Sequence, residues 1–279
     1  MRTTILLVLL SMILIVGGDA AAKFLGTQGF DPVFLAWARF ALAAVVVAPF
    51  AGLQKSDLTQ VTDWRILLRA LLIVGGITFI LTALKPQDIA IVFVGFFVGL
   101  IVAYGLSAIL LKEQISWTRS GLLGLSFLGV LIVVRPGFGM TAGMGFAILA
   151  GCFHGAYLVA TRWLAGEIQP RFLLISQLVV GAIVLAPFAI GPLPAITTSA
   201  AILIGISAMG SAIGNLILVL VNRTTPANVI APLIYSQLIV ATVLGVAVFG
   251  DWPDGATLIG LLIIGGAGVA SVWFAGRGR

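Results

Sequence analysis

The sequence predicts an all-α integral membrane protein whose ten transmembrane helices form two inverted five-helix repeats. Three observations lead to this prediction: long apolar segments, the distribution of lysine and arginine between them, and sequence matches at a constant offset. Of the 279 residues, 61% are hydrophobic and only 9% are charged, whereas a soluble domain carries about 25% charged residues. The apolar residues come in blocks of about 20, the length that a helix needs to cross a bilayer.

Charged residues, prolines and turn residues divide the chain into ten apolar segments, and each is expected to form one transmembrane helix. The first segment contains DAAAKF at 19–24, which resembles a signal-peptide cleavage site. The internal repeat described below requires this segment as a helix, so we expect it to be retained. The ten expected helices span residues 4–25, 32–52, 64–84, 88–111, 117–135, 142–163, 170–190, 197–221, 226–249 and 255–275.

Lysine and arginine are concentrated on one side of the expected helices. If the N-terminus is cytoplasmic, eleven of them lie on the cytoplasmic side and three on the opposite side, with Arg39 inside a helix. Because positive residues are enriched in cytoplasmic loops, both termini are expected in the cytoplasm of a bacterial cell, with the helices in the inner membrane. The cytoplasmic set is Arg2, Lys55, Arg65, Arg69, Lys112, Arg119, Arg162, Arg171, Arg223, Arg277 and Arg279, and the opposite set is Lys23, Lys85 and Arg135.

Sequence matches between the two halves indicate an internal repeat. DPVF at Asp31–Phe34 is followed by APF at Ala48–Phe50, and QPRF at Gln169–Phe172 is followed by APF at Ala186–Phe188. Both matches have an offset of 138 residues. Further pairs at offsets of 138 to 139 are Glu113 with Asp251, Gly121 with Gly260 and Gly129 with Gly268.

The repeat unit contains five expected helices, so the second copy must enter the membrane from the opposite side. We expect a first repeat at 1–137 with helices one to five and a second at 138–279 with helices six to ten. Inverted repeats of this kind are typical of secondary transporters, which bind their substrate between the halves near the middle of the membrane.

Several segments resemble a known transporter family. APLIYSQLIVATVLGVAVFGDWPD at 231–254 and TLIGLLIIGGAGV at 257–269 resemble the last two helices of EamA-type members of the drug/metabolite transporter (DMT) superfamily. DAAAKF, WARF at 37–40 and LLKEQISWTRSGLLGLSFLGVLIVVRPG at 110–137 resemble the first half of that pattern, with an acid and a lysine in helix one and an arginine in helix two.

The resemblance covers nearly the whole chain. It implies ten helices in two inverted five-helix repeats and the transport of amino acids, vitamins, nucleotide-like metabolites or drugs. The fourth helix differs from the family pattern, because VFVGFFVGLIVAYG at 92–105 lacks the mid-helix proline that is common in relatives. Gly99 is therefore the candidate hinge of the first half.

Asp19, Lys23 and Arg39 are charged residues within expected helices, where charge usually marks a substrate pathway, a proton relay or an ion pair. Asp19 and Lys23 are four residues apart and share a helix face. Asp19 and Arg39 each lie about ten residues from the turn near 28–29, so they reach a similar depth and are expected to pair. The pair is either a structural tether or part of a site that binds a charged substrate group or a proton.

Polar residues also occur at the repeat-related positions of the second half. At the offset of 138 residues, Asp19, Lys23 and Arg39 correspond to Tyr157, Thr161 and Gln177. A tether needed only for folding would be expected in both halves, so this difference in charge favours a role in binding a ligand or an ion.

Two further helices carry candidate binding residues. His154 shares a helix face with Tyr157, and Asn215 lies one turn from Ser211. His154 is the only histidine, and it either bridges helices by a hydrogen bond or takes part in transport. Asn215 either packs between helices or lines the pathway.

The ninth expected helix combines a helix-breaking residue with polar side chains. Pro232 frees a backbone carbonyl, which is tolerated in a membrane only next to protein or a wet cavity. Tyr235 and Gln237 follow it closely and supply hydrogen-bonding groups. We interpret this segment as a cavity wall with a hinge at Pro232, and helix packing is the alternative.

These features predict a secondary transporter that works by alternating access on a small organic metabolite, such as an amino acid or a vitamin like riboflavin. A multidrug or nucleotide-like metabolite exporter is the alternative substrate class. A membrane sensor or a channel is the alternative class of protein, although no loop is long enough for a signalling domain. The protein is not expected to be an enzyme, because one histidine, one cysteine and one deeply placed carboxylate cannot supply a catalytic set.

The partners expected from the sequence are a small-molecule substrate and the lipid bilayer. The single cysteine, Cys152, provides neither a disulfide framework nor a metal-ligand cluster, and no cofactor is expected. Basic residues occur singly between apolar blocks, so nucleic acid is not an expected partner despite the net charge of +6. The protein is expected to be a monomer or a homodimer.

Overall fold

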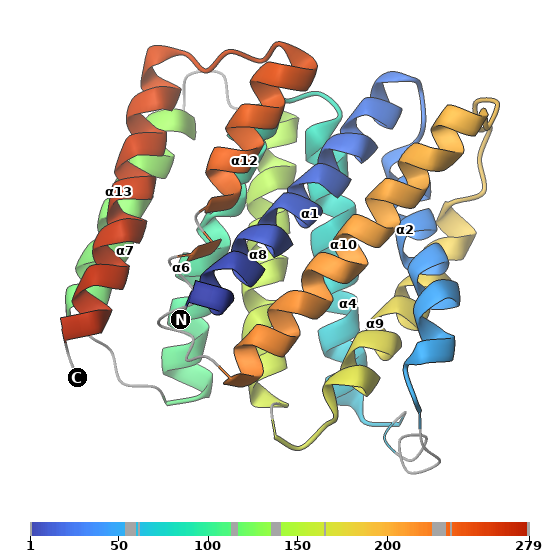
Figure 1. Ribbon diagram of the computed structural model, residues 1–279, viewed down its shortest axis with the longest axis horizontal. Coiled ribbons are helices and arrows are strands. Elements are labelled where there is room, and N and C mark those ends of the chain that lie inside the picture. The colour runs from blue at the N-terminus through green and yellow to red at the C-terminus, as the bar shows by residue number, and fades with distance from the viewer. Residues whose placement is uncertain are drawn as a thin grey trace.

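The computed structural model describes residues 2–53, 60, 62–112, 117–134, 141–164, 166–224, 233–234 and 236–277. In this part of the chain every regular element is a helix, which confirms the all-α prediction. The helices run roughly side by side and connect through loops at the two ends of the bundle (Figure 1). Pro232 and Tyr235, which the sequence suggested as hinge and cavity wall, lie outside the described residues.

The described helices follow the ten expected segments in order, with the fourth segment divided into α5 and α6. Their bounds are α1 (Arg2–Thr27), α2 (Pro32–Val47), α4 (Trp64–Leu84), α5 (Ile89–Phe96), α6 (Val98–Leu110), α7 (Trp117–Val134), α8 (Ala142–Trp163), α9 (Pro170–Leu185), α10 (Thr198–Thr224), α12 (Ser236–Leu244) and α13 (Gly255–Arg277). Short turns η1 (Ala48–Phe50), η2 (Ala186–Phe188) and η3 (Gly245–Phe249) extend α2, α9 and α12.

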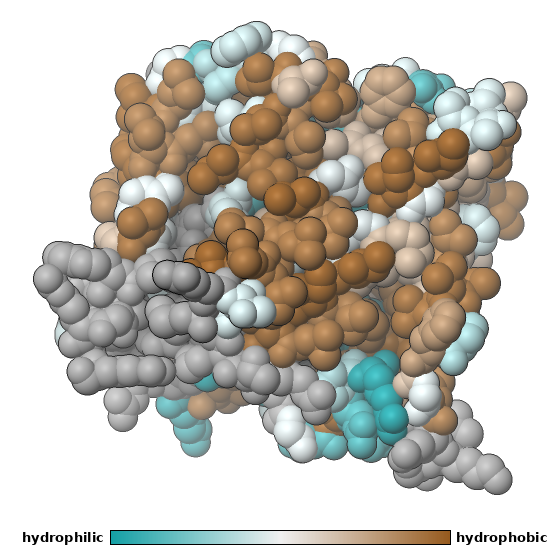
Figure 2. Space-filling view, viewed as in Figure 1, coloured by the Kyte–Doolittle hydropathy of each residue, from teal (hydrophilic) through white to brown (hydrophobic). Residues whose placement is uncertain are grey.

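The surface of the bundle is suited to lipid. Within the described residues, seven helical segments are long and apolar enough to cross a membrane. The outward-facing side chains of Val45, Ile109 and Leu262 are more than 70% exposed, and such surface is covered by acyl chains in a bilayer. Apolar side chains dominate the described part of the face in Figure 2. The protein is therefore a multi-pass membrane protein.

Helices α2 and α9 begin and end alike because their sequences match at these points. Pro32 and Pro170 occupy the first positions of the two helices, where the missing N–H has no helical partner to lose. Asp31 caps α2 by accepting a hydrogen bond from the backbone N–H of Val33 at 2.8 Å. Both helices have 16 residues and continue into an APF turn.

The fourth expected helix is interrupted at Phe97, between α5 and α6. The N–H of Phe97 is shared between the carbonyl oxygens of Phe93 and Val94, each at 3.1 Å. The segment is apolar and has no proline at Phe97, so the position of the interruption was not predicted from the sequence. The candidate hinge Gly99 follows two residues later in α6, and its movement stays a prediction.

The helices pack in pairs that join distant parts of the sequence. Helix α1 packs along α10 and α4 along α8, while α2 contacts α9. Helices α7 and α13 form a pair at one edge of the bundle (Figure 1). The largest buried apolar cluster includes side chains from α1, α2, α4, α5, α8 and α9. Each of these pairs combines one helix before residue 138 with one helix after it.

Helices α6 and α8 approach each other so closely that their backbones touch. A Cβ atom added to Gly99 would overlap the carbonyl oxygen of Gly151, and one added to Gly155 would overlap that of Gly99. Small residues allow membrane helices to approach in this way, because no hydrophobic effect drives helices together within lipid. The contact requires glycine, since a backbone atom cannot move aside as a side chain does.

We predict that Gly99→Ala lowers the stability of the protein by about 1–3 kcal/mol, the usual cost of overpacking. The matched control is Gly105→Ala in the same helix, where an added Cβ meets nothing within 4 Å. Both changes replace glycine by alanine in the same helix and favour the helical state, so the main difference between them is steric. Thermal unfolding of the detergent-purified variants measures the difference, and equal midpoints for the two would contradict the packing argument.

Candidate functional site

A cavity lies inside the bundle among α1, α2, α4, α5, α6, α8, α10 and α12. Its volume is about 130 Å³, and most of its lining is apolar. Its lining includes residues from both sides of position 138, which fits a site between two halves. The polar side chains that line it are Asp19, Arg39, His154, Tyr157, Thr161, Ser211, Asn215 and Gln237.

Most of the binding residues suggested by the sequence lie at this cavity. Asp19, Arg39, His154, Tyr157, Asn215 and Gln237 line it, as does Gly99. Lys23 and Gln177 lie outside the lining, and Tyr235 is not among the described residues. The participation of these residues in substrate binding stays a prediction.

Asp19 and Arg39 form the expected ion pair. The Nη1 atom of Arg39 lies 2.7 Å from the Oδ1 atom of Asp19, and both side chains are less than 5% exposed. The Nη2 atom of Arg39 also donates to Ser207 Oγ at 2.9 Å and to the carbonyl of Gly18 at 3.3 Å. The guanidinium therefore joins α1, α2 and α10 at one wall of the cavity.

Arg69 forms a second interhelical cluster at another wall. Its Nη2 atom donates to the hydroxyl of Tyr157 at 2.9 Å, and its Nε atom donates to Thr161 Oγ1 at 2.8 Å. Its Nη1 atom donates to the carbonyl of Leu173 at 2.9 Å, and the hydroxyl of Tyr157 donates to Gln177 Oε1 at 3.2 Å. This cluster joins α4, α8 and α9.

Arg69 was not identified from the sequence as part of a buried cluster, because it was counted only among the positive charges of the cytoplasmic side. The side chain is in fact 1% exposed. The repeat offset contained a usable signal: position 69 corresponds to position 207, and Ser207 is a partner of Arg39. The pair Tyr157 and Gln177 likewise corresponds to the pair Asp19 and Arg39, and both pairs are bonded.

His154, Asn215 and Gln237 present hydrogen-bonding groups at the cavity. The ring of His154 lies 4.9 Å from that of Phe96 and 5.6 Å from that of Tyr157, measured between centroids. Asn215 donates from Nδ2 to the carbonyl of Ser211 at 2.8 Å, which leaves its Oδ1 atom as an acceptor. Aromatic faces beside such groups suit a ligand that carries a ring and several polar atoms.

One end of the bundle is closed above the cavity. Lys23 pairs with Asp251 at 2.7 Å, and its ammonium lies 4.4 Å from the centroid of the Phe249 ring. Burial, together with the nearby Asp251 carboxylate, raises the pKa of Asp88 above its usual range, and Lys23 partly opposes this. Leu84 and Ile89 are fully buried at the same end. Lys23 therefore belongs to this closure rather than to the cavity lining.

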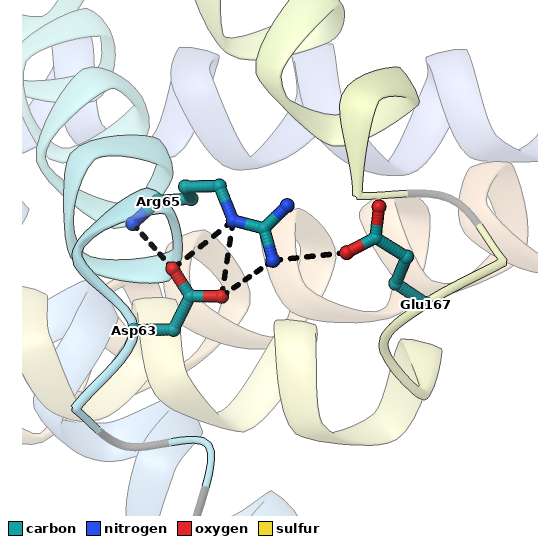
Figure 3. A network of polar contacts seen from close by, with 3 residues as sticks. All are labelled: Asp63, Arg65 and Glu167. Atoms are coloured by element: carbon teal, nitrogen blue, oxygen red, sulfur yellow. Dashed lines mark hydrogen bonds and ion pairs between the residues drawn. The ribbon is translucent and has the colours of Figure 1, made fainter.

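A different ion network lies at the opposite end of the bundle, where α4 begins and α8 ends (Figure 3). The Nη2 atom of Arg65 lies 2.8 Å from Asp63 Oδ2 and 2.9 Å from Glu167 Oε2. Hydrogen bonds from Arg65 hold the pKa of Asp63 below its usual range. Glu167 is more than half exposed, so water screens this network, which links α4 to the loop after α8.

Comparison with known proteins identifies the family to which the sequence is similar. Residues 2–135 and 141–273 each match the EamA-like transporter family. The chain is 25% identical over 261 residues to the S-adenosylmethionine uptake transporter of Rickettsia bellii (strain RML369-C), across 92% of this chain and 88% of that protein. It is 26% identical over 265 residues to the S-adenosylmethionine uptake transporter of Rickettsia conorii (strain ATCC VR-613 / Malish 7), across 92% of this chain and 87% of that protein.

The fold is also similar to that of a solved crystal structure. The TM-score is 0.71 at 18% sequence identity, over 99% of this chain and 98% of that one. With the two family matches, this likeness extends along nearly the full length of the chain. The chain therefore belongs to the EamA-like transporter family and is a membrane transporter rather than an enzyme.

Proposed function

We propose that the protein is an inner-membrane secondary transporter that moves a small organic metabolite by alternating access through the central cavity. The observation that carries the proposal is the cavity itself, which lies inside the bundle and is lined by a buried ion pair and aromatic side chains from both halves. Secondary transporters bind their substrates at such places, near the middle of the membrane. Both termini are then cytoplasmic, as the distribution of lysine and arginine suggests.

The transporter is proposed to consist of two inverted five-helix repeats, 1–137 and 138–279. The two separate family matches support this division. The packing also supports it, because the contact of α1 with α10 has its counterpart in that of α8 with α4. Helices α2 and α9, which correspond at the offset of 138 residues, contact each other, as do α7 and α13. A two-fold relation between the halves accounts for these contacts.

S-adenosylmethionine is the first substrate to test. The named function of the Rickettsia relatives suggests it, and its chemistry suits the cavity. Its sulfonium is a cation that aromatic faces such as those of Phe96 and Tyr157 attract. Its adenine ring and amino acid group require the stacking surfaces and hydrogen-bonding groups that His154, Asn215 and Gln237 offer. Free amino acids, riboflavin and nucleotide-like compounds remain the alternative substrates.

The size of the cavity bears on how a substrate could be accommodated. Sites for drug-sized ligands usually exceed about 300 Å³, and this cavity offers about 130 Å³. A nucleoside-sized substrate therefore requires the helices to move apart. The end of the bundle with Lys23 and Asp251 is closed in this structure.

We expect proteoliposomes that contain the purified protein and are preloaded with unlabelled S-adenosylmethionine to take up the radiolabelled compound by counterflow. Exchange across an alternating-access carrier accelerates uptake from the opposite side, whereas a channel shows no such acceleration. Empty liposomes are the control, and unlabelled methionine, riboflavin and adenosine serve as competitors. Uptake no faster than in empty liposomes would remove S-adenosylmethionine as the substrate.

For the ion pair, we predict that Asp19→Asn and Arg39→Gln each lower the stability of the protein by about 3–5 kcal/mol, because each leaves an unpaired buried charge. The double variant should recover most of the lost stability, since no charge then remains. Thermal unfolding of the four proteins measures this. No recovery in the double variant would show that the two side chains do not act as a pair.

The transport activity of the same double variant separates the two interpretations of the pair. A tether can be replaced by neutral residues of similar shape, so full transport would make the pair structural. Recovered folding without counterflow would place the pair in substrate or proton binding.

For His154, we predict that His154→Phe preserves folding but weakens substrate binding about 2–10-fold, the loss of one neutral hydrogen bond. Phenylalanine keeps an aromatic ring beside Phe96 and removes only the ring nitrogens. Thr78→Val is the control, because the Thr78 hydroxyl bonds to the carbonyl of Val74 in its own helix. Competition in the counterflow assay gives both affinities, and an unchanged His154→Phe affinity would exclude the hydrogen bond.

A further inference from the structure

Arg69 is a buried cation without an ion pair in the described part of the chain. Lys23, Arg39 and Arg65 each pair with a carboxylate there. Arg69 is 1% exposed, yet its three partners are the Tyr157 hydroxyl, the Thr161 hydroxyl and the Leu173 carbonyl. A charge removed from water is strongly disfavoured unless hydrogen bonds and an opposite charge compensate for it. Here the hydrogen bonds are present, but no carboxylate among the described residues supplies the opposite charge.

The guanidinium of Arg69 also has N–H groups that these hydrogen bonds do not use. It has five N–H groups, and the bonds to Tyr157, Thr161 and Leu173 use three of them. The hydroxyl of Tyr157 donates to Gln177, and that of Thr161 donates to the carbonyl of Tyr157 at 2.7 Å. Both hydroxyl protons are therefore engaged. Additional donors for an anion at this place come from Arg69.

Arg69 backs a wall of the cavity. Tyr157 and Thr161, which accept its hydrogen bonds, both line the cavity, and so does Ile73, one turn further along α4. The guanidinium carbon lies 4.7 Å from the centroid of the Tyr157 ring. At the other wall, the charge of Arg39 is neutralised by Asp19 at 2.7 Å. The cavity therefore has one neutral wall and one positive wall.

We propose that the wall formed by Arg69, Tyr157 and Thr161 is the subsite for an anionic group of the substrate, specifically a carboxylate. This rests on the proposed function, in that it takes the cavity as the substrate site. A bound carboxylate supplies the missing opposite charge and accepts the remaining N–H groups of Arg69. A planar carboxylate fits a guanidinium through two parallel hydrogen bonds, which chloride cannot reproduce.

The test is thermal unfolding of the detergent-purified protein in sodium acetate and in sodium chloride at equal ionic strength. Acetate is expected to raise the midpoint saturably above its value in chloride, because a ligand that binds only the folded state stabilises it. At ten times its dissociation constant, acetate favours the folded state about 11-fold, which corresponds to a rise of roughly 3–5 °C for a chain of this size. Equal midpoints in the two salts would overturn the proposal.

Variants locate the effect. Arg69→Gln should abolish the difference in unfolding midpoint between acetate and chloride. Arg69→Lys should keep part of it, because lysine keeps the positive charge but lacks the parallel N–H donors of a guanidinium. The matched control is Arg162→Gln, since Arg162 is an exposed arginine near the same end of α8. A full acetate effect in Arg69→Gln would overturn the proposal.

A second pair of variants covers the case in which Arg69→Gln fails to fold. Thr161→Asp places a carboxylate beside Arg69 Nε, where Thr161 Oγ1 now lies at 2.8 Å. This built-in counter-charge should preserve or raise stability and remove the response to acetate. Thr161→Asn has nearly the same shape without the charge and should keep the response. A response to acetate that survives in Thr161→Asp would contradict a carboxylate site at this wall.

The outcomes of these experiments also distinguish a failure of the carboxylate subsite from a failure of S-adenosylmethionine as the substrate. An acetate response that depends on Arg69, together with failed counterflow of S-adenosylmethionine, would support the carboxylate subsite and reject that substrate. Counterflow without any acetate response would reject the subsite and leave the transport function intact.

Discussion

The ion pair between Asp19 and Arg39 is the interaction on which the arrangement of the helices around the cavity depends. Helices in lipid gain nothing from the hydrophobic effect when they associate, so close packing and polar contacts must hold them. The Arg39 guanidinium bonds to α1 through Asp19 and to α10 through Ser207, and it is carried by α2. Helices α1 and α10 both line the cavity. One side chain thus fixes how two cavity walls meet, and its bond to Ser207 joins residues that are 168 positions apart in the sequence.

The Arg69 cluster has the same plan with a different distribution of charge. Positions 19, 39 and 207 hold Asp, Arg and Ser, while the corresponding positions 157, 177 and 69 hold Tyr, Gln and Arg. Each cluster contains one guanidinium that joins three helices, but the arginine comes from α2 in one and from α4 in the other. Only the first cluster contains a carboxylate. The two walls of the cavity therefore differ in charge, which under the proposed function would suit a substrate with two chemically distinct ends.

Much of the fold was predictable because membrane helices follow from local sequence. Apolar segments of sufficient length gave ten helices, and the depth of Asp19 and Arg39 relative to one turn gave their pairing. The interruption at Phe97 was not predictable, since the segment has neither proline nor a polar residue there. Lys23 and Asp251 are separated by 228 residues, and only the tertiary packing of α1 against α12 brings them together. The burial of Arg69 was not predicted, because an arginine near a helix end can either extend to the membrane surface or be buried between helices, and the sequence pattern is the same in both cases.

The contacts around the cavity differ in kind, and this difference determines which of them is expected to break most easily. At the closed end, Lys23 and Asp251 meet at 2.7 Å, and Asp251 is 19% exposed, so water can replace the contact as it opens. Asp88 adds a second carboxylate at this end, and its repulsion with Asp251 is partly offset by its attraction to Lys23. Between α6 and α8, by contrast, glycine backbones touch within the membrane, where separation would leave a void that only lipid or substrate could fill. In the proposed alternating-access cycle, the end where α12 and its following turn meet α1 is therefore expected to open first, and the α6–α8 pair is expected to move as one body.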